Sequence, residues 1–342
     1  MTLPQPADVL TRPHPGAAPL LAVDDLAVEF QTRSGVVKAL EAVTFTVQPG
    51  ETVGIVGESG SGKSVTAFTL MGVLDRAGQI TAGRALFQSD QGAVDLLKES
   101  ESTLRQLRGK ELSMIFQNPR LALNPIRKVG KQITDVLRCH TDLGKSELQA
   151  RAIDLLTSVR IPAPQQRYDA YPYELSGGLC QRIMIALALA CSPKLLIADE
   201  PTTGLDVTTQ ATVMNLIKEL TRQRQMATIL ITHDLALASE YCDRVVVMHA
   251  GHVVESAPTA DLFRHPRHPY TAKLIAATPE PHKSLADLTP IGGKLPDLKA
   301  AQIPVCRFSQ RCDRYEASFC NQAPLAREFL TAEHQVACWK PL

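Results

Sequence analysis

The order of hydrophobic and polar residues along the chain predicts an α/β fold. Residues 19–30 (PLLAVDDLAVEF) and 40–47 (LEAVTFTV) alternate apolar and polar side chains, which is typical of half-buried strands. The apolar runs at 51–57, 194–199 and 227–234 are short and continuous instead, as in strands buried on both faces of a parallel sheet. The pattern therefore indicates a mixed sheet at the core.

Two kinds of helical segment are predicted around these strands. Large apolar residues recur at helical spacing in 63–74, directly after one of the apolar strands. From about 118 to 190, helical segments alternate with proline-rich joints, which predicts a helical subdomain inserted between strands of the core. Residues 244–256 (RVVVMHAGHVVES) predict a hairpin that turns at Ala250 and Gly251.

Changes in composition divide the chain into three predicted regions. Residues 1–19 are rich in proline and are expected to form a flexible lead, whereas residues 20–278 carry the α/β pattern. Proline and glycine become frequent after about Pro279, and cysteines follow. Residues 279–342 are therefore predicted to be a small C-terminal Cys-rich extension.

Composition and charge limit the classes of function. The 342 residues include 36 Lys and Arg against 35 Asp and Glu, and the net charge of +1 gives no electrostatic footprint for nucleic acid. The longest apolar stretch, 183–191, is about half of the roughly 18–20 residues that a membrane-spanning helix needs, and it predicts a buried helix. We therefore expect a chain that does not cross a membrane by itself. Because no secretory signal is evident, a reducing cytosol without disulfides is the default expectation.

A glycine-rich motif predicts a phosphate-binding loop. Residues 57–64 (GESGSGKS) fit G-x-x-x-x-G-K-[ST] and lie between a predicted strand and a predicted helix. Glycines let the backbone wrap closely, so that successive N–H groups and the helix N-terminus face the phosphates. Lys63 is placed to bind the β- and γ-phosphates, and the Ser64 hydroxyl to coordinate Mg²⁺. The candidate nucleotide-binding residues here are Gly57, Glu58, Ser59, Gly60, Ser61, Gly62, Lys63 and Ser64.

A second motif, LLIADEP at residues 195–201, ends a buried strand with two carboxylates. Asp199 is placed to bind Mg²⁺, and Glu200 to orient or deprotonate an attacking water. An Asp-Glu pair alone usually marks a strand that simply ends in solvent. The phosphate-binding loop makes the functional interpretation the favoured one.

Residues 175–182 (LSGGLCQR) resemble the signature sequence of ATP-binding-cassette (ABC) ATPases. Other elements of that family follow in the expected order: MIFQNP with Gln117 is similar to the Q-loop, GLD with Asp206 to the D-loop, and ITHD with His233 to the switch segment. The chain is identified as a member of this family. The resemblance implies a P-loop NTPase cassette, with a mixed sheet core and a helical subdomain, that hydrolyses ATP.

The resemblance also implies a shared catalytic interface. In the family, the signature segment faces the ATP held by the opposite subunit, so that two nucleotides are enclosed between two cassettes. A helix N-terminus suits this role because its free N–H groups attract phosphate. The residues expected there are Ser176, Gly177 and Gly178, with Asp206 nearby in the D-loop.

Further roles follow from the family pattern. His233 would contact the γ-phosphate, and Gln117 would sense it and link the site to the helical subdomain. Phe30 would stack on adenine, although a core phenylalanine at the end of a strand explains that residue equally well. The Mg²⁺ ligands implied are Ser64, Gln117 and Asp199.

Two segments narrow the resemblance to the ATPases of oligopeptide, dipeptide and nickel importers. Residues 264–281 (RHPRHPYTAKLIAATPEP) resemble the His-Pro-Tyr segment that follows the cassette in this group, and 113–125 (SMIFQNPRLALNP) its Q-loop region. The resemblance covers roughly residues 20–339. His265 and His268 are interpreted as part of a structural clamp in preference to metal ligands.

The importer family implies partners at the cytoplasmic face of the inner membrane. These are a second ATPase subunit, usually a different chain, two transmembrane permease subunits and an extracytoplasmic solute-binding protein. The residues after Gln117 would form the groove for a permease coupling helix, although a solvated basic face (Arg120, Arg127, Lys128, Lys131) explains them too. The transported solute stays open among dipeptides, oligopeptides, D-amino dipeptides, opines and metal chelates. The alternative function is an ABC regulatory ATPase without a permease, acting on nucleic acid or ribosomes.

Three positions depart from the family pattern. Leu179 and Cys180 stand where the signature more often has Met and a polar or basic residue, and we expect tuned rather than lost function. Gly204 replaces the commoner Ala of the D-loop, which is expected to alter flexibility at the dimer interface.

Four of the eight cysteines, Cys306, Cys312, Cys320 and Cys338, lie close to the C-terminus. Their spacing resembles the region of longer importer ATPases in which four cysteines hold a [4Fe–4S] cluster. Four thiolates satisfy such a cluster, and its negative charge suits basic neighbours. Zinc bound by four thiolates and free thiols are the alternatives, although the absence of a C-x2-C pair weakens the zinc interpretation. The residues expected to surround the cluster are Arg307, Arg311 and Arg314 as charges, and Phe308, Phe319 and Trp339 as water-excluding groups.

The other four cysteines, Cys139, Cys180, Cys191 and Cys242, are scattered along the cassette. We expect them to be unpaired core residues.

Overall fold

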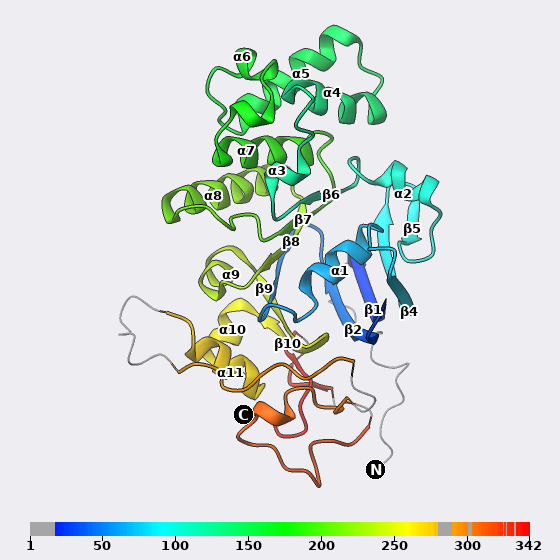
Figure 1. The fold of residues 1–342 in the computed structure, drawn as a ribbon, viewed down its shortest axis with the longest axis vertical. Helices are drawn as coiled ribbons and strands as arrows, with labels where there is room; N and C mark the ends of the chain where they lie inside the picture. Colours follow the sequence, from blue (N-terminus) through cyan, green and yellow to red (C-terminus); the bar gives the residue numbers. More distant parts are fainter. Residues whose placement is uncertain (1–17, 280–288, 300–302, 324, 326, 332) are drawn as a thin grey trace. The chain divides into compact units, whose positions relative to one another are not determined.

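The structure is a computed structural model that describes residues 18–279, 289–299, 303–323, 325, 327–331 and 333–342 (Figure 1). Most of the predicted lead at 1–19 therefore lies outside the described residues. The chain forms two compact units, one of residues 1–48, 53–98 and 232–342 and one of residues 49–52 and 99–231. These units divide the chain differently from the boundary expected near Pro279, which stays a prediction.

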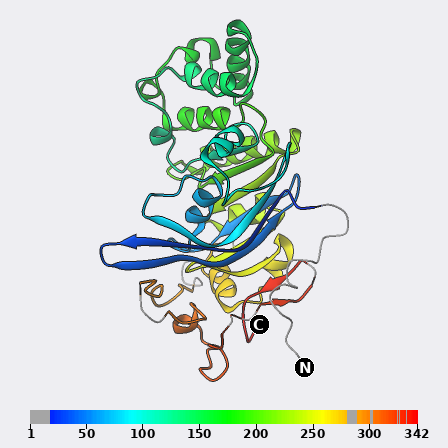
Figure 2. The ribbon, with the colours of Figure 1, turned by 90° about the vertical axis from the view of Figure 1, so that its right-hand side faces the viewer.

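The first unit contains a four-stranded antiparallel sheet in the order β2-β1-β4-β5. Figure 2 shows β1 and β2 as a long hairpin in blue. Leu21, Val23, Leu26 and Val28 of β1 are fully buried, and the alternation shifts by one residue at a bulge between Val23 and Leu26. The strands are β1 (Leu21–Thr32), β2 (Gly35–Val47), β4 (Gly78–Ser89) and β5 (Gly92–Asp95).

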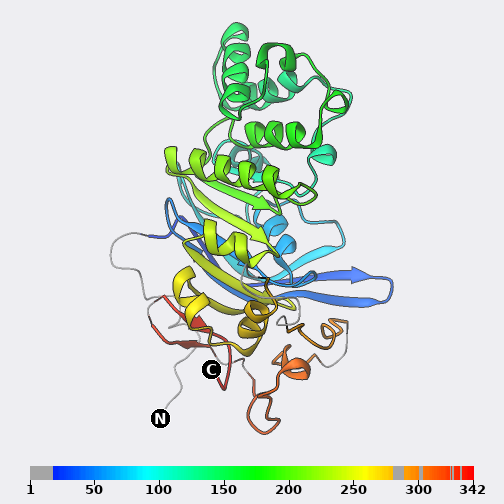
Figure 3. The same ribbon diagram turned by 90° about the vertical axis from the view of Figure 1, so that its left-hand side faces the viewer.

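Five further strands of this unit lie in the order β11-β12-β10-β9-β3 as part of a larger sheet, and among them only β9 and β3 are parallel neighbours. The predicted hairpin is confirmed: β9 and β10 are joined at Ala250 and Gly251, whose positive φ angles of 46° and 86° suit a tight hairpin turn. Figure 3 shows the short C-terminal strands, in red, beside this hairpin. The strands are β3 (Thr52–Val56), β9 (Arg244–His249), β10 (His252–Pro258), β11 (Glu328–Phe329) and β12 (Gln335–Val336).

The helices of the first unit are short and follow the strands. The helix predicted at 63–74 is present but ends earlier, at Leu70, where Gly72 follows with a φ of 62°. They are α1 (Lys63–Leu70), α9 (Leu235–Tyr241), α10 (Thr259–Arg264), α11 (Pro269–Ala276) and the 3₁₀ turn η4 (Ser309–Arg311).

The second unit has a parallel sheet in the order β8-β7-β6, and every residue of these strands is buried. They are β6 (Leu112–Ile115), β7 (Leu195–Asp199) and β8 (Ala227–Thr232), as the continuous apolar runs predict. Between Pro119 and Ala188 the described elements are all helical. The helices of this unit are α2 (Glu101–Leu107), α3 (Pro119–Ala122), α4 (Val129–His140), α5 (Lys145–Ser158), α6 (Pro164–Tyr168), η2 (Pro172–Glu174), α7 (Gly177–Ala188) and α8 (Val207–Gln223).

The run predicted to be a buried helix, 183–191, lies mostly in α7 and is largely buried. Within the ranges that the structure describes, every helix is too short or too polar to cross a lipid bilayer.

Close packing of α4 against Tyr168 gives a test of the helical region. A Cβ atom built on Gly130 would lie 2.1 Å from the Tyr168 ring, so Gly130→Ala must displace the ring even though alanine is the better helix former. We expect a loss of about 1–3 kcal/mol in the free energy of unfolding, measured by chemical denaturation. Arg138→Ala, on the exposed side of the same helix, is the control. Equal denaturation midpoints for the two variants would contradict this packing.

Candidate functional site

The predicted phosphate-binding loop follows β3 and leads into α1. Three of its glycines have positive φ: Gly57 at 150°, Gly60 at 80° and Gly62 at 104°. A Cβ at Gly57 would lie 2.1 Å from the Met248 carbonyl oxygen, so no other residue fits there without moving β9. The loop therefore has the tightly wrapped backbone that binding the phosphates of a nucleoside triphosphate requires.

Lys63 is the first residue of α1 and is buried. Its Nζ donates hydrogen bonds to the carbonyl oxygens of Gly57, at 2.8 Å, and Glu58, at 3.0 Å. The hydroxyl oxygen of Ser61 is buried in the same loop and has no hydrogen-bond partner among the described residues. A cation and an unsatisfied hydroxyl beside a helix N-terminus fit an anionic ligand.

Glu58 joins this loop to the C-terminal extension. Its carboxylate accepts two hydrogen bonds from Arg311, 2.7 Å from Nη1 and 2.8 Å from Nη2. Its backbone N–H donates to the Tyr270 hydroxyl at 3.1 Å. The Arg311 guanidinium is the main cause that lowers the pKa of Glu58. The side chain of Glu58 is thus held by the extension.

Two other predicted site residues of the first unit, Phe30 and His233, differ from each other in how far they are buried. The Phe30 ring is half-buried on β1 and would lie 3.0 Å from a Cβ built on Gly78 of β4. His233 directly follows β8 and is exposed. Their predicted contacts with adenine and γ-phosphate stay predictions.

The second unit brings Gln117 and Glu200 together. Asp199, the last residue of β7, is buried, and Glu200 follows it with a positive φ of 45°. One carboxylate oxygen of Glu200 accepts a hydrogen bond from Gln117 Nε2, at 2.9 Å, and another from Thr203 Oγ1, at 2.8 Å. The strained backbone of Glu200 fits a carboxylate whose direction is fixed by its surroundings. Thr203 was not predicted from the sequence, and its only signal is its place three residues after the acidic pair.

The signature segment opens α7, as predicted. Ser176 is the exposed N-cap, and its hydroxyl accepts a hydrogen bond from the Leu179 N–H at 3.4 Å. Nothing lies within 4 Å of a Cβ built on Gly177, so this helix end is open to a ligand. On the same helix, buried Gln181 donates to the Pro201 carbonyl at 2.5 Å, which ties α7 to the segment that follows Glu200.

Asp206 caps α8. Its carboxylate accepts hydrogen bonds from the Thr209 N–H, at 3.0 Å, and from Thr209 Oγ1, at 2.7 Å, and the first of these is the main cause that lowers its pKa. This capping contact gives Asp206 a structural role within its own unit. Its predicted role at a nucleotide stays a prediction.

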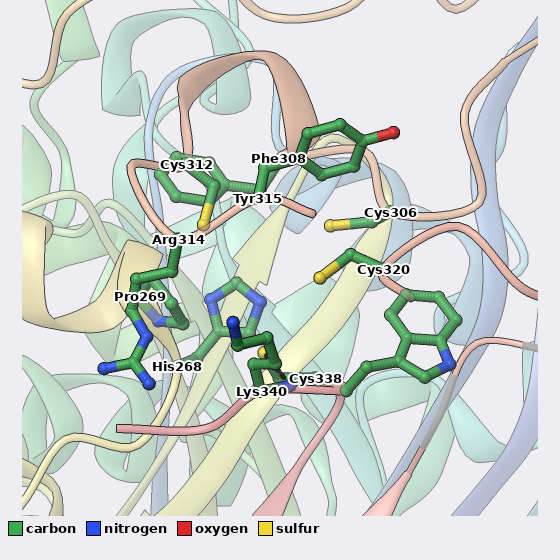
Figure 4. A pocket seen from close by; sticks show the side chains of 11 residues that line it. His268, Pro269, Cys306, Phe308, Cys312, Arg314, Tyr315, Cys320, Cys338 and Lys340 are labelled. Carbon is green, nitrogen blue, oxygen red and sulfur yellow. Dashed lines mark hydrogen bonds between the residues drawn. The ribbon is translucent and has the colours of Figure 1, made fainter. Parts of the chain in front are cut away.

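The four C-terminal cysteines surround one cavity, shown in Figure 4. The cavity encloses about 320 Å³, including the part open to solvent. Burial raises the pKa of Cys306 to about 11, and it also raises the pKa values of Cys312 and Cys338. Three of the four thiols therefore stay protonated at neutral pH unless a cationic group replaces their protons. The other lining residues are His268, Pro269, Phe308, Arg314, Tyr315, Trp339 and Lys340.

Some residues expected around this cavity have other positions. Arg311 pairs with Glu58, and Arg307 pairs with Glu41 and the Ala250 carbonyl, so neither guanidinium is committed to the cysteines. Phe319 is 45% exposed and does not line the cavity. Among the described residues, no group of three or more His, Cys, Asp or Glu side chains has the arrangement of a metal-binding site, so the predicted cluster stays a prediction.

The remaining cysteines are free thiols, as expected, but they are not all core residues. Cys180 and Cys242 are buried, whereas Cys191 is half-buried and Cys139 is exposed on α4. The expectation of four core cysteines was therefore wrong for Cys139, which lies on the polar side of an amphipathic helix.

Known proteins match the chain in two regions. The ABC transporter family matches residues 40–203, and the C-terminal region of oligopeptide/dipeptide transporters matches residues 254–320. The dipeptide transport ATP-binding protein DppD of Escherichia coli (strain K12) is 45% identical over 94% of this chain and 97% of its own length. The oligopeptide transport ATP-binding protein OppD of Salmonella typhimurium is 44% identical over 99% of this chain and 96% of its own length.

Solved structures agree on the fold. A dimeric ATP-binding cassette in a post-hydrolysis state with ADP and phosphate has a TM-score of 0.62 and 24% identity, and the match covers 70% of this chain and 98% of that one. A cassette of the cbiONQ transporter complex from Clostridium perfringens has a TM-score of 0.59 and 28% identity, over 72% and 91% of the two chains. Fold and motifs together define an ABC ATPase. With relatives of this identity along nearly its whole length, the chain belongs to the ATP-binding proteins of oligopeptide/dipeptide ABC transporters.

The contacts of Glu200 predict the outcome of removing its charge. Glu200→Gln should preserve ATP binding but slow phosphate release in a single-turnover assay by roughly 10²–10⁴-fold, because Glu200 is predicted to orient or deprotonate the attacking water and an amide cannot accept its proton. Glu219→Gln, which changes an exposed carboxylate on α8, should leave the rate within about twofold. Near-normal phosphate release by Glu200→Gln would assign the general base to another group.

Proposed function

We propose that this chain is the ATP-hydrolysing subunit of an importer for peptides or related small solutes. The observation that carries the proposal is that the nucleotide motifs and the segment after the cassette occur together in one chain, and relatives named for dipeptide and oligopeptide transport match it across both. ATP binding and hydrolysis by this subunit would drive solute uptake through partner permeases.

The proposed ATPase chemistry gives each nucleotide motif a role. The N–H groups of the glycine loop bind the phosphates, and Lys63 exchanges its carbonyl partners for phosphate oxygens when the nucleotide binds. Ser64, Gln117 and Asp199 would hold Mg²⁺ through oxygen ligands of the kind this ion prefers, and the ion would supply positive charge for the phosphates. Glu200 orients the water, and His233 contacts the γ-phosphate.

The exposed N-terminus of α7 supports a dimeric site. Ser176 caps α7, Gly177 and Gly178 begin it, and a Cβ built on Gly177 meets open space. In the proposed dimer these groups bind the ATP held by a second cassette, so that ATP holds the two subunits together and hydrolysis releases them. This partner would be a different ATPase chain, as is usual in the family.

The segment after Gln117 supports a permease contact. Leu121 and Ile126 are each 85% exposed, which is unusual for large aliphatic side chains in a short stretch of sequence. Gln117 begins this segment and hydrogen-bonds Glu200, so a helix docked on the segment would be linked to the catalytic carboxylate. We propose that this surface receives a cytoplasmic helix of the permease.

The four-cysteine cavity supports a [4Fe–4S] cluster. The four cysteines line one cavity, and four thiolates are the ligand set that such a cluster requires. A single zinc ion bound by the same four thiols is the alternative. Arg314 lines the cavity as a positive charge, whereas Lys340 Nζ is paired with Glu316 at 2.8 Å. The Lys340 backbone N–H donates to Cys338 Sγ at 3.4 Å, a contact that also occurs at cluster sulfurs.

The permease contact can be tested by co-purification. Leu121→Asp combined with Ile126→Asp should remove integral membrane proteins from the material that co-purifies with the tagged chain from detergent-solubilised native membranes, because charges replace the exposed apolar surface. Val73→Asp, which changes a partly exposed apolar residue elsewhere, should retain them. Recovery of ribosomes or nucleic acid with the unmodified chain would instead favour the regulatory ATPase, and equal recovery of permeases by all variants would exclude this docking surface.

The cluster can be tested on the protein purified without oxygen. We expect about four iron atoms and four acid-labile sulfides per chain, with broad visible absorption. Cys306→Ser should remove most of this absorption, whereas Cys139→Ser, which alters the exposed cysteine of α4, should leave it unchanged. A colourless chain that contains zinc, or one without metal, would contradict the assignment.

A further inference from the structure

The contact between Arg311 and Glu58 connects the phosphate-binding loop with the cysteine-rich extension, two regions that lie far apart in the sequence. Glu58 is the second residue of the phosphate-binding loop, and Arg311 directly precedes Cys312 in the cysteine-rich extension. The two residues are 253 positions apart and belong to the same compact unit. Their bidentate geometry, with both hydrogen bonds at 2.7–2.8 Å, is the strongest form of charge pair between side chains.

Arg311 is itself held in place from several sides. Its side chain is only 3% exposed, and its Nε donates to the Gly292 carbonyl at 2.9 Å. Its own carbonyl accepts a hydrogen bond from Lys273 Nζ at 2.9 Å, and its guanidinium lies over the Phe308 ring. These partners hold the Arg311 side chain in one conformation. The position of its guanidinium therefore determines where the Glu58 carboxylate lies.

The position of Arg311 depends in turn on the cysteines. The turn η4 that contains it lies between Cys306 and Cys312, and the Ser309 N–H donates to the Cys306 carbonyl at 3.0 Å. The Arg311 N–H donates to the Phe308 carbonyl at 2.9 Å. A group bound by both Cys306 and Cys312 holds the chain on either side of this turn. Without such a group, neither thiol anchors it.

A second path runs through aromatic rings. Phe308 lines the cysteine cavity and packs against Tyr270, with ring centroids 5.3 Å apart. The Tyr270 hydroxyl accepts the Glu58 N–H, so both the backbone and the side chain of Glu58 are fixed by groups next to the cavity. His249 completes this group, with its ring 4.4 Å from Tyr270 and its Nδ1 3.8 Å from the Glu58 carboxylate.

We propose that Arg311 is a positioning residue of the phosphate-binding loop and that the occupied four-cysteine site strengthens ATP binding by holding Arg311 against Glu58. The second half of this inference rests on the proposed cluster. No atom of the cluster takes part in ATP chemistry. The effect on the loop is one of affinity, since the reacting carboxylate and histidine are not part of the contact.

The affinity of the full-length chain for ATP, measured by isothermal titration calorimetry without oxygen, tests the first half. Arg311→Ala should weaken ATP binding about tenfold, and Arg311→Lys, which keeps the charge but not the bidentate contact, should recover part of that loss. Glu58→Ala should weaken binding to a similar extent, and the double variant should be no weaker than either single variant. In steady-state assays KM should rise while kcat stays within about twofold, which general destabilisation would not produce.

Arg327→Ala is the matched control. Arg327 also joins the extension to the cassette, through Asp25 and Thr44 at 3.3 Å each, but it contacts β1 and β2 and not the loop. Its removal should leave ATP affinity within about twofold. Additive effects of Glu58→Ala and Arg311→Ala, or an equal loss in Arg327→Ala, would overturn the role of Arg311.

The second half is tested by removing the metal from the same protein. Cluster-free chain, prepared with oxidant and chelator and checked for iron, should bind ATP about tenfold more weakly than cluster-loaded chain, and Arg311→Ala should bind ATP equally in both forms. If the loaded and cluster-free chains bind ATP equally, the coupling is wrong although the cluster assignment stands. If the purified chain contains no iron, the cluster assignment and the coupling fail together, while the Glu58 and Arg311 variants still decide the positioning role.

Discussion

The carbonyl oxygen of Met248 at the end of β9 sets the shape of the phosphate-binding loop. It occupies the space where a side chain at Gly57 would begin, so the chain must leave β3 with a backbone that only glycine adopts easily. β3 and β9 are parallel neighbours, and their pairing keeps this carbonyl in place. This contact therefore constrains the backbone that leads into the phosphate-binding loop.

A buried carboxylate organises the other side of the same unit. Glu255 on β10 is 1% exposed and accepts hydrogen bonds from the N–H groups of Arg267, at 2.7 Å, and His268, at 2.9 Å. Its carboxylate also lies 2.8 Å from His334 Nε2 in the extension. Burial of a carboxylate is costly unless each oxygen has a partner, and here the partners come from the His-Pro-Tyr segment and the C-terminal region. That segment therefore connects the strands to the extension, as a structural clamp does.

Burial lowers the pKa of His268 to about 3, so its neutral Nδ1 accepts the Tyr270 N–H and caps α11.

Local features of the fold could be predicted from the sequence because each has a short-range cause. Strand periodicity, the glycine loop and the N-cap of α7 depend on residues a few positions apart, and the structure places each as expected. Contacts between distant residues could not be predicted. Arg311 was expected beside the cysteines because it is adjacent to Cys312, yet its side chain leaves the cavity for Glu58. Phe319 was expected to cover the cavity for the same reason of proximity in sequence, and it is exposed. Sequence spacing predicts which residues have neighbouring backbone positions. The direction in which a side chain points depends on the tertiary fold.

Arg311 and Arg314 of the extension have different roles because their surroundings differ. A guanidinium has its N–H groups in one plane, and Arg311 uses this plane for Glu58 on one edge and the Gly292 carbonyl on another. Few of its donors remain for sulfur, and the guanidinium that lines the cavity is that of Arg314. The electrostatic environment of the four cysteines and the mechanical link to the loop are therefore supplied by different residues. For this reason a substitution at Arg311 disturbs the loop without removing the charges that line the cavity, and the two roles can be separated in one protein.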